Sequence, residues 1–239
     1  MTASRGRRRG HKQRTAAVVV LALMGLSALS GCSSNLTPGV AATINGQAIQ
    51  QDQVDSVVSA ACAYTAATAG SEQAPAPVSL ANLRASITAA LVQFAVIDRA
   101  AAAMGLTVDQ AAIAQNASQN SIPSGLSKAD TAALKTFFDA VGKSTAQTQL
   151  IGAHLADPSI TTSSQVKSDQ TAQASSYLAK YVTKQDVRVN PAYGRWSGKT
   201  VVGGSGSLSD PVTAAAKDSQ AAASSSQANA SDLPASQVC

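Results

Sequence analysis

The residues of this sequence with the greatest capacity for chemistry are its three cysteines. Cys32 follows an apolar run and two small residues, whereas Cys62 and Cys239 stand alone in the later chain. A thiol can carry a lipid, form a disulfide or bind a metal, depending on its surroundings. The only histidine after Cys32 is His154, so the sequence lacks the Cys/His clusters that bind zinc. We expect no metal and no cofactor, and a structural or surface role for His154.

Patterns typical of other catalytic sites are missing too. The stretch Gly203–Ser207 lacks the G-x-S-x-G order of a nucleophile elbow. No phosphate-binding glycine motif occurs, and the acidic residues are too scattered to place a pair of carboxylates in one cleft. We therefore expect that the protein is not an enzyme.

Residues 1–31 have the layout of a secretory signal. Six basic side chains lie between residues 5 and 14, and the uncharged apolar run 15–29 is too short to span a membrane as a stable helix. The ending Leu29-Ser30-Gly31-Cys32 resembles the lipobox of bacterial lipoproteins. This resemblance implies cleavage before Cys32, a lipid such as palmitate on its sulfur, and anchoring at the outer face of the cytoplasmic membrane. The alternative is an ordinary cleaved signal with an incidental cysteine.

Removal of the signal changes the charge. It holds six of the 18 Lys and Arg residues and none of the 13 acidic ones, so 12 basic and 13 acidic groups remain. The remaining chain is close to neutral, which gives no indication of nucleic-acid binding. Hydrophobic residues make up 45% of the chain and aromatic residues only 3%. Because alanine supplies much of the 45%, we expect a thin, helical core. No stretch after the signal is apolar enough for us to expect a membrane span.

Hydrophobic spacing predicts five helices and two short strands. Turn and cap residues such as Asn45-Gly46, Gly105 and Ser127 separate them. We expect Thr107 and Gln110 to form a capping box, and Ser163 or Ser164 to cap the fifth helix. The expected helices are about 50–68, 80–104, 107–122, 128–156 and 163–181, and the expected strands are 40–44 and 187–189.

The composition divides the chain into four parts. Residues 1–31 are the signal, 32–39 a short tether, 40–202 a helical domain and 203–239 a tail rich in Gly, Ser and Ala. The tail has few large apolar residues, so it cannot offset the entropy lost on ordering, and we expect it to be flexible. A frayed helix over 211–229 is the alternative.

Two stretches at the ends of the predicted helical domain resemble a known family. Ala42-Thr43-Ile44-Asn45-Gly46-Gln47-Ala48-Ile49 resembles the opening of SurA- and PrsA-type extracytoplasmic chaperones. Val189-Asn190-Pro191-Ala192-Tyr193-Gly194-Arg195-Trp196 resembles their closing segment. The resemblance covers about 40–197. It implies a mainly α, SurA N-terminal-like domain in which the two ends pair as a two-stranded sheet, with Tyr193 and Trp196 packed over it.

The sequence departs from this family in two places. Catalytic members carry a parvulin domain before the closing strand, but only about thirty residues separate Ala156 from Val187, and a predicted helix takes most of them. The family also more often has Ser or Thr where this sequence has Gln50. The resemblance therefore implies a lipoprotein without prolyl isomerase activity.

From this resemblance we expect a chaperone-like protein that binds unfolded or exported polypeptides. Phe94, Phe137 and Phe138 are candidates to line the binding surface, and the alternative is that they are plain core residues. The alternative is a structural or assembly lipoprotein that binds one folded partner of the cell envelope.

The two remaining thiols form a candidate disulfide. Disulfides persist outside the cytoplasm, where an even number of thiols is more often bonded than free. The tail is long enough to bring Cys239 to Cys62 on the first predicted helix. The alternative is a buried, free Cys62 and a Cys239 that pairs with another chain.

The first testable prediction concerns the anchor. Replacing Cys32 with Ala removes the sulfur that carries the lipid, so the protein should be released from the membrane or remain unprocessed. Fractionation of cells and the mass of the processed chain measure this outcome. Normal processing with unchanged membrane retention would contradict the lipobox, because stable attachment requires several acyl chains.

Overall fold

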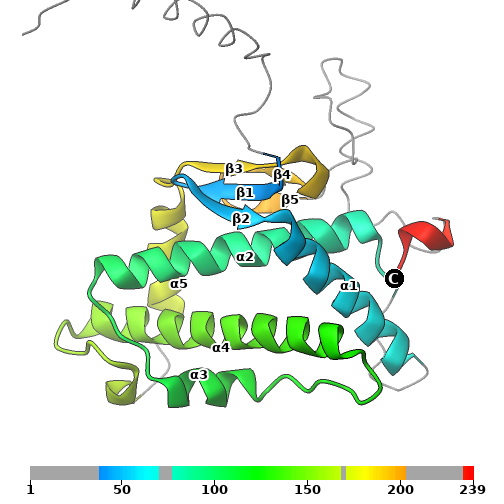
Figure 1. The fold of residues 1–239 in the computed structure, drawn as a ribbon. Helices are drawn as coiled ribbons and strands as arrows, with labels where there is room; N and C mark the ends of the chain where they lie inside the picture. The colour runs from blue at the N-terminus through cyan, green and yellow to red at the C-terminus, as the bar shows by residue number, and fades with distance from the viewer. Residues whose placement is uncertain (1–37, 70–76, 168–170, 203–233) are drawn as a thin grey trace, which may run out of the picture. The chain divides into compact units, whose positions relative to one another are not determined.

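The computed structural model describes residues 38–69, 77–167, 171–202 and 234–239 (Figure 1). The chain divides into two units, Met1–Asn35 and Leu36–Cys239, and every described residue belongs to the second. The predicted signal, Cys32 and most of the predicted tail therefore lie outside the described residues.

A tight hairpin opens the described chain. Strand β1 (Val40–Ile44) pairs antiparallel with β2 (Gln47–Gln50), and the predicted Asn45-Gly46 turn joins them. Asn45 and Gly46 have φ angles of 48° and 81°, the left-handed pair that a type I′ turn requires. The turn is confirmed. The sequence-based prediction misses β2 because Ile49 is the only large apolar residue of that strand.

The two ends of the domain meet in one sheet. Strand β3 (Val187–Val189) pairs antiparallel with β1, giving the order β2-β1-β3. Asn45 reinforces this pairing: its side chain donates to Gln185 Oε1 at 2.7 Å and accepts from the Asp186 N–H at 2.8 Å. The predicted pairing of the opening and closing strands is confirmed.

The structure also contains a second, two-stranded sheet that the sequence did not predict. After a 3-10 turn (Pro191–Tyr193), β4 (Arg195–Trp196) and β5 (Val201–Val202) form a separate hairpin. Each strand has only two residues, too few for a periodic signal. Gly194 permits the close packing of this hairpin, because a Cβ there would lie 2.6 Å from the Val202 carbonyl oxygen.

Within the described residues, five α-helices lie between β2 and β3, in agreement with the predicted number. The predicted cap Ser127 is confirmed, because the Asp130 N–H donates to Ser127 Oγ at 3.0 Å. Ser79 caps α2 in the same way, with the Asn82 N–H donating to Ser79 Oγ at 3.2 Å. The helices are α1 (Gln51–Thr68), α2 (Leu80–Ala103), α3 (Gln110–Ala117), α4 (Lys128–Ala156) and α5 (Thr171–Val182).

Two predicted helix starts are wrong for one shared reason. Thr107 forms a parallel bridge with Thr162 instead of capping a helix, and α3 begins at Gln110. Ser163 donates through its hydroxyl to Asp109 Oδ2 at 2.9 Å and lies in a short 3-10 turn (Ser163–Gln165), whereas α5 begins at Thr171. Both predicted caps thus hold the loop before α3 against the loop after α4.

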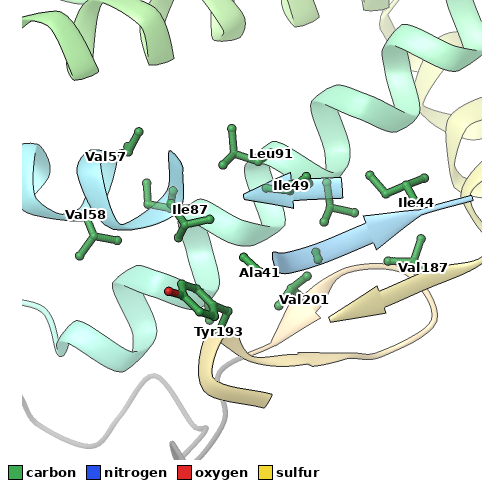
Figure 2. Packing of buried hydrophobic residues seen from close by; sticks show 14 of the residues in the cluster. Ala41, Ile44, Ile49, Val57, Val58, Ile87, Leu91, Val187, Tyr193 and Val201 are labelled. Carbon is green, nitrogen blue, oxygen red and sulfur yellow. The ribbon is translucent and has the colours of Figure 1, made fainter. Parts of the chain in front are cut away.

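Helix α2 lies at the centre of the packing. Figure 1 shows the sheet and α4 on opposite sides of α2, and Figure 2 shows Leu91 of α2 beside Ile49 of β2. The main core cluster joins the sheet to α1 and α2, and Ala41, Ala42 and Ile44 of β1 are completely buried in it. A second cluster joins α2 to α4 and α5 through Ile97, Ala100, Ala101, Ile151 and Ala174.

Helix α2 corrects the expectation that no later stretch could span a membrane. By length and composition it is apolar enough to do so. In this structure, however, it packs against β1, α1, α4 and α5, and its buried positions include Val92, Val96 and Ile97. Its apolar character therefore accounts for the centre of the core.

Tyr193 ties the closing segment to the helices. It is only 7% exposed, and its hydroxyl donates to Asp55 Oδ2 of α1 at 2.7 Å. Arg84 of α2 lies on the same carboxylate, with Nε 3.7 Å from Oδ1. Trp196 is partly buried against the same cluster. The predicted packing role of Tyr193 and Trp196 is confirmed.

The second prediction follows from this contact. Tyr193→Phe keeps the ring and removes the hydrogen bond to Asp55, so the free energy of unfolding should fall by about 1 kcal/mol. Tyr64→Phe is the matched control, because within the described residues the Tyr64 hydroxyl has no hydrogen-bond partner. Chemical denaturation of both variants measures the difference. Equal stability of the two variants would contradict a stabilising role for this bond.

The same contact predicts a pH dependence. Burial and the hydrogen bond to Asp55 raise the pKa of Tyr193 from its ordinary value of 10.0 to about 12. The contribution of the protonated Tyr193 hydroxyl to stability is therefore complete below pH 10 and is lost as the pH rises toward 12. The stability difference between the wild type and Tyr193→Phe should shrink over this interval, and a constant difference would contradict the assignment.

Candidate functional site

Strand β2, helix α2 and helix α4 form a groove with a volume of about 510 Å³. We call it the α2–α4 groove. Its apolar lining comes from Ile49, Leu91, Phe94, Ala95, Ala102 and Ala140, and its polar lining from Gln47, Gln53, Asp98, Arg99, Lys143, Ser144 and Gln147, with Ala48 of β2 at one edge. The groove thus combines an apolar floor with a charged end.

An ion pair crosses the groove from α2 to α4. Asp98 Oδ1 lies 2.6 Å from Lys143 Nζ, and Gln147 Nε2 donates to the same oxygen at 2.6 Å. Both charged side chains are nearly half exposed, so the pair contributes little to stability. Its effect on the groove is electrostatic: Lys143 neutralises the negative charge of Asp98.

Arg99 is the charge of this groove that no carboxylate balances. Its Nη2 donates to the Ile44 carbonyl oxygen at 3.2 Å and to Gln47 Oε1 at 3.1 Å, and both acceptors are neutral. Its Nε is buried without a hydrogen-bond partner. Among the described residues no acidic side chain pairs with Arg99. The charged end of the groove therefore carries a net positive charge of about one.

The structure brings the three predicted binding phenylalanines together. The rings of Phe94 and Phe137 have centroids 5.8 Å apart, and those of Phe137 and Phe138 are 6.2 Å apart. All three are half-buried. Only Phe94 lines the α2–α4 groove, whereas Phe137 packs against the main core. Of the three, Phe94 alone both packs against this core and lines the groove, so it is the candidate contact residue.

Sequence reasoning missed the polar residues of the groove. Asp98 and Lys143 are 45 positions apart on different helices, and the partners of Arg99 lie on β1 and β2, more than 50 positions earlier. No local pattern marks such pairs. Their position follows only once β2 and the packing of α2 against α4 are known.

A second cavity, of about 270 Å³, lies between α2, α5 and the turn of the β4–β5 hairpin. Trp196, Lys199 and Leu178 contribute to its lining. Because it is about half the size of the α2–α4 groove, it is the weaker candidate.

His154 has a structural contact, in line with its expected role. Its Nδ1 lies 2.8 Å from the Ile160 carbonyl oxygen, which fixes the loop after α4. Within the described residues, no group of three His, Cys, Asp or Glu side chains could hold a metal ion.

The structure joins Cys62 of α1 to Cys239 by a disulfide. Their Cα atoms are 4.9 Å apart, within the usual range for a disulfide. Backbone contacts support the approach: Val238 forms an antiparallel bridge with Ser79, and the Cys239 N–H donates to the Val78 carbonyl oxygen at 3.0 Å. The pairing in the oxidised protein stays a prediction, and so does lipidation of Cys32.

Comparison with known families identifies the class of protein. Residues 7–147 match the model of the SurA-like N-terminal domain, more than half of the chain. The chain belongs to this family, whose domains are chaperone-type, extracytoplasmic and non-catalytic. No curated protein and no solved structure gives a significant match to the chain. The family match ends within α4, so the closing segment is assigned to the domain by its pairing with β1.

The fourth prediction concerns the disulfide. Mass spectrometry of the proteolysed, non-reduced protein should find a peptide that joins Cys62 to Cys239, and reduction should separate its two halves. Detection of a free Cys62 thiol in protein taken from the cell envelope without reductant would contradict the pairing.

Proposed function

We propose that this chain is a chaperone-like protein that binds unfolded or exported polypeptides without catalysis. Binding takes place in the α2–α4 groove, and a lipid on Cys32 holds the protein at the outer face of the cytoplasmic membrane. The observation that carries the proposal is an open groove with an apolar floor that includes Phe94, in a member of a chaperone-type family.

The dimensions of the groove suit part of a polypeptide. Its volume of about 510 Å³ falls within the range of ligand sites and accommodates a few large side chains. Leu91 and Phe94 supply an apolar surface that can contact bound side chains of different shapes. The glutamines and charged residues around this floor keep the groove compatible with water. Such a site is compatible with apolar side chains from many different polypeptide segments.

The lining favours binding over chemistry. The described residues of the groove include no histidine, cysteine or tyrosine, and its one carboxylate, Asp98, is engaged by Lys143 and Gln147. The amine of Lys143, the neighbour of Ser144, is paired with Asp98 and is not free to take a proton from the Ser144 hydroxyl.

The fifth prediction tests the groove as the binding surface. Phe94→Gln replaces the aromatic floor with a polar side chain and should reduce protection of several unrelated unfolded proteins against aggregation by severalfold. Phe138→Gln is the matched control, since Phe138 belongs to the same aromatic cluster but does not line the groove. Light scattering measures aggregation, and thermal melting verifies that both variants are folded.

Two outcomes would contradict the proposal. Undiminished protection by folded Phe94→Gln would remove the groove from the mechanism. Protection of none of the unfolded proteins, together with one partner that co-purifies in fixed proportion, would favour the alternative of a structural lipoprotein with one folded partner.

A further inference from the structure

We propose that the α2–α4 groove binds its polypeptide in an extended conformation, as a strand added antiparallel to the free edge of β2. The added strand places an apolar side chain opposite Ile49 and a carboxylate opposite Gln47. This inference rests on the proposed function and adds to it the conformation and the chemistry of the bound segment.

The first step is the open edge of β2. It is the end strand of the order β2-β1-β3, and within the described residues it pairs with β1 alone. In a two-residue hairpin the residues next to the turn, Ile44 and Gln47, exchange both hydrogen bonds. The following pair, Thr43 and Ala48, does not, so the N–H and C=O of Ala48 point away from β1. Ala48 is exposed, and an open edge of this kind is a template for another strand.

The second step is the position of this edge beside the groove. Gln47, Ala48 and Ile49 are all part of the groove lining. A paired strand would lie about 4.8 Å further from β1, a single strand spacing from the edge. Hydrogen bonds to Ala48 and side-chain contacts with α2 and α4 are therefore available to one extended segment.

The third step fixes the side-chain pattern. Residues two apart share one face of a strand, and Ile49 and Gln47 both contact α2 residues. Ile49 is buried beside Leu91 (Figure 2), and Phe94 lines the same part of the groove. A residue opposite Ile49 thus meets an apolar surface.

The charge of the groove selects the other residue. Gln47 accepts from Arg99, whose positive charge has no acidic partner among the described residues, whereas Asp98 is already neutralised by Lys143. A carboxylate opposite Gln47 would balance Arg99. Because β2 runs from Gln47 to Ile49, an antiparallel segment reads apolar residue, any residue, then Asp or Glu.

The experiment uses the full chain, purified in detergent, and synthetic heptapeptides with a central Phe-x-Glu sequence. The residue opposite Ala48 is x, so its N–H points toward β2, whereas the N–H of the Glu points away. N-methylation at x should weaken binding about tenfold or more, and N-methylation at the Glu should leave binding nearly unchanged. Replacing Glu with Gln, or reversing the order to Glu-x-Phe, should weaken binding about fivefold.

Variants of β2 test the same edge from the protein side. Ala48→Pro removes the outward N–H without removing a hydrogen bond to β1, and should reproduce the effect of methylation at x. Ala48→Val keeps the N–H and is the matched control. If Ala48→Pro fails to fold, as judged by circular dichroism, the methylation scan on the wild type still decides the question.

The outcomes separate the two proposals. Peptide binding that Phe94→Gln weakens, but that is equally sensitive to methylation at x and at Glu, would overturn strand addition and keep the groove as the binding site. Equal binding of Phe-x-Glu and Glu-x-Phe would overturn the antiparallel pattern. Failure to bind any of the peptides, with no protection of unfolded proteins, would overturn the proposed function as well.

Discussion

The fold depends on the pairing of β1 with β3, which joins segments more than 140 residues apart in the sequence. Neither strand is stable alone, because isolated short strands bury too little surface. Once paired, they cover α2 and bring Tyr193 to Asp55 on α1. The same pairing holds β1 in place, and β1 in turn holds β2 with its open edge at the groove. The candidate site therefore depends on the pairing of β1 with β3.

The scarcity of large side chains makes this pairing more important. Ala41 and Ala42 of β1 are fully buried, and their small size lets the sheet approach α2 closely. Helix α3 approaches α4 in the same way at Gly142, where a Cβ would lie 2.5 Å from the Ile113 carbonyl oxygen. Close backbone packing compensates for the small area that each alanine buries. Two of the few aromatic rings join separate elements: Phe94 of α2 contacts Phe137 of α4, and Tyr193 bonds to Asp55 of α1.

Local signals were sufficient where one residue type determines backbone geometry. Asn45-Gly46 predicted the turn, Ser127 predicted the start of α4, and apolar spacing predicted α1, α2 and α4. Signals failed where a tertiary contact competes: the side chain of Ser163, an expected cap, bonds to Asp109 instead. The polar half of the groove was beyond prediction, because Arg99 depends on partners in β1 and β2.

The central claim is that the closing segment holds the whole domain together. Thermal unfolding of the full chain, compared with a chain that lacks residues 187–197, tests it most directly. The account predicts that the truncated chain loses the cooperative transition or melts at a much lower temperature, since β1 loses β3 and the core loses Tyr193. An unchanged melting temperature and an equally sharp transition would contradict it.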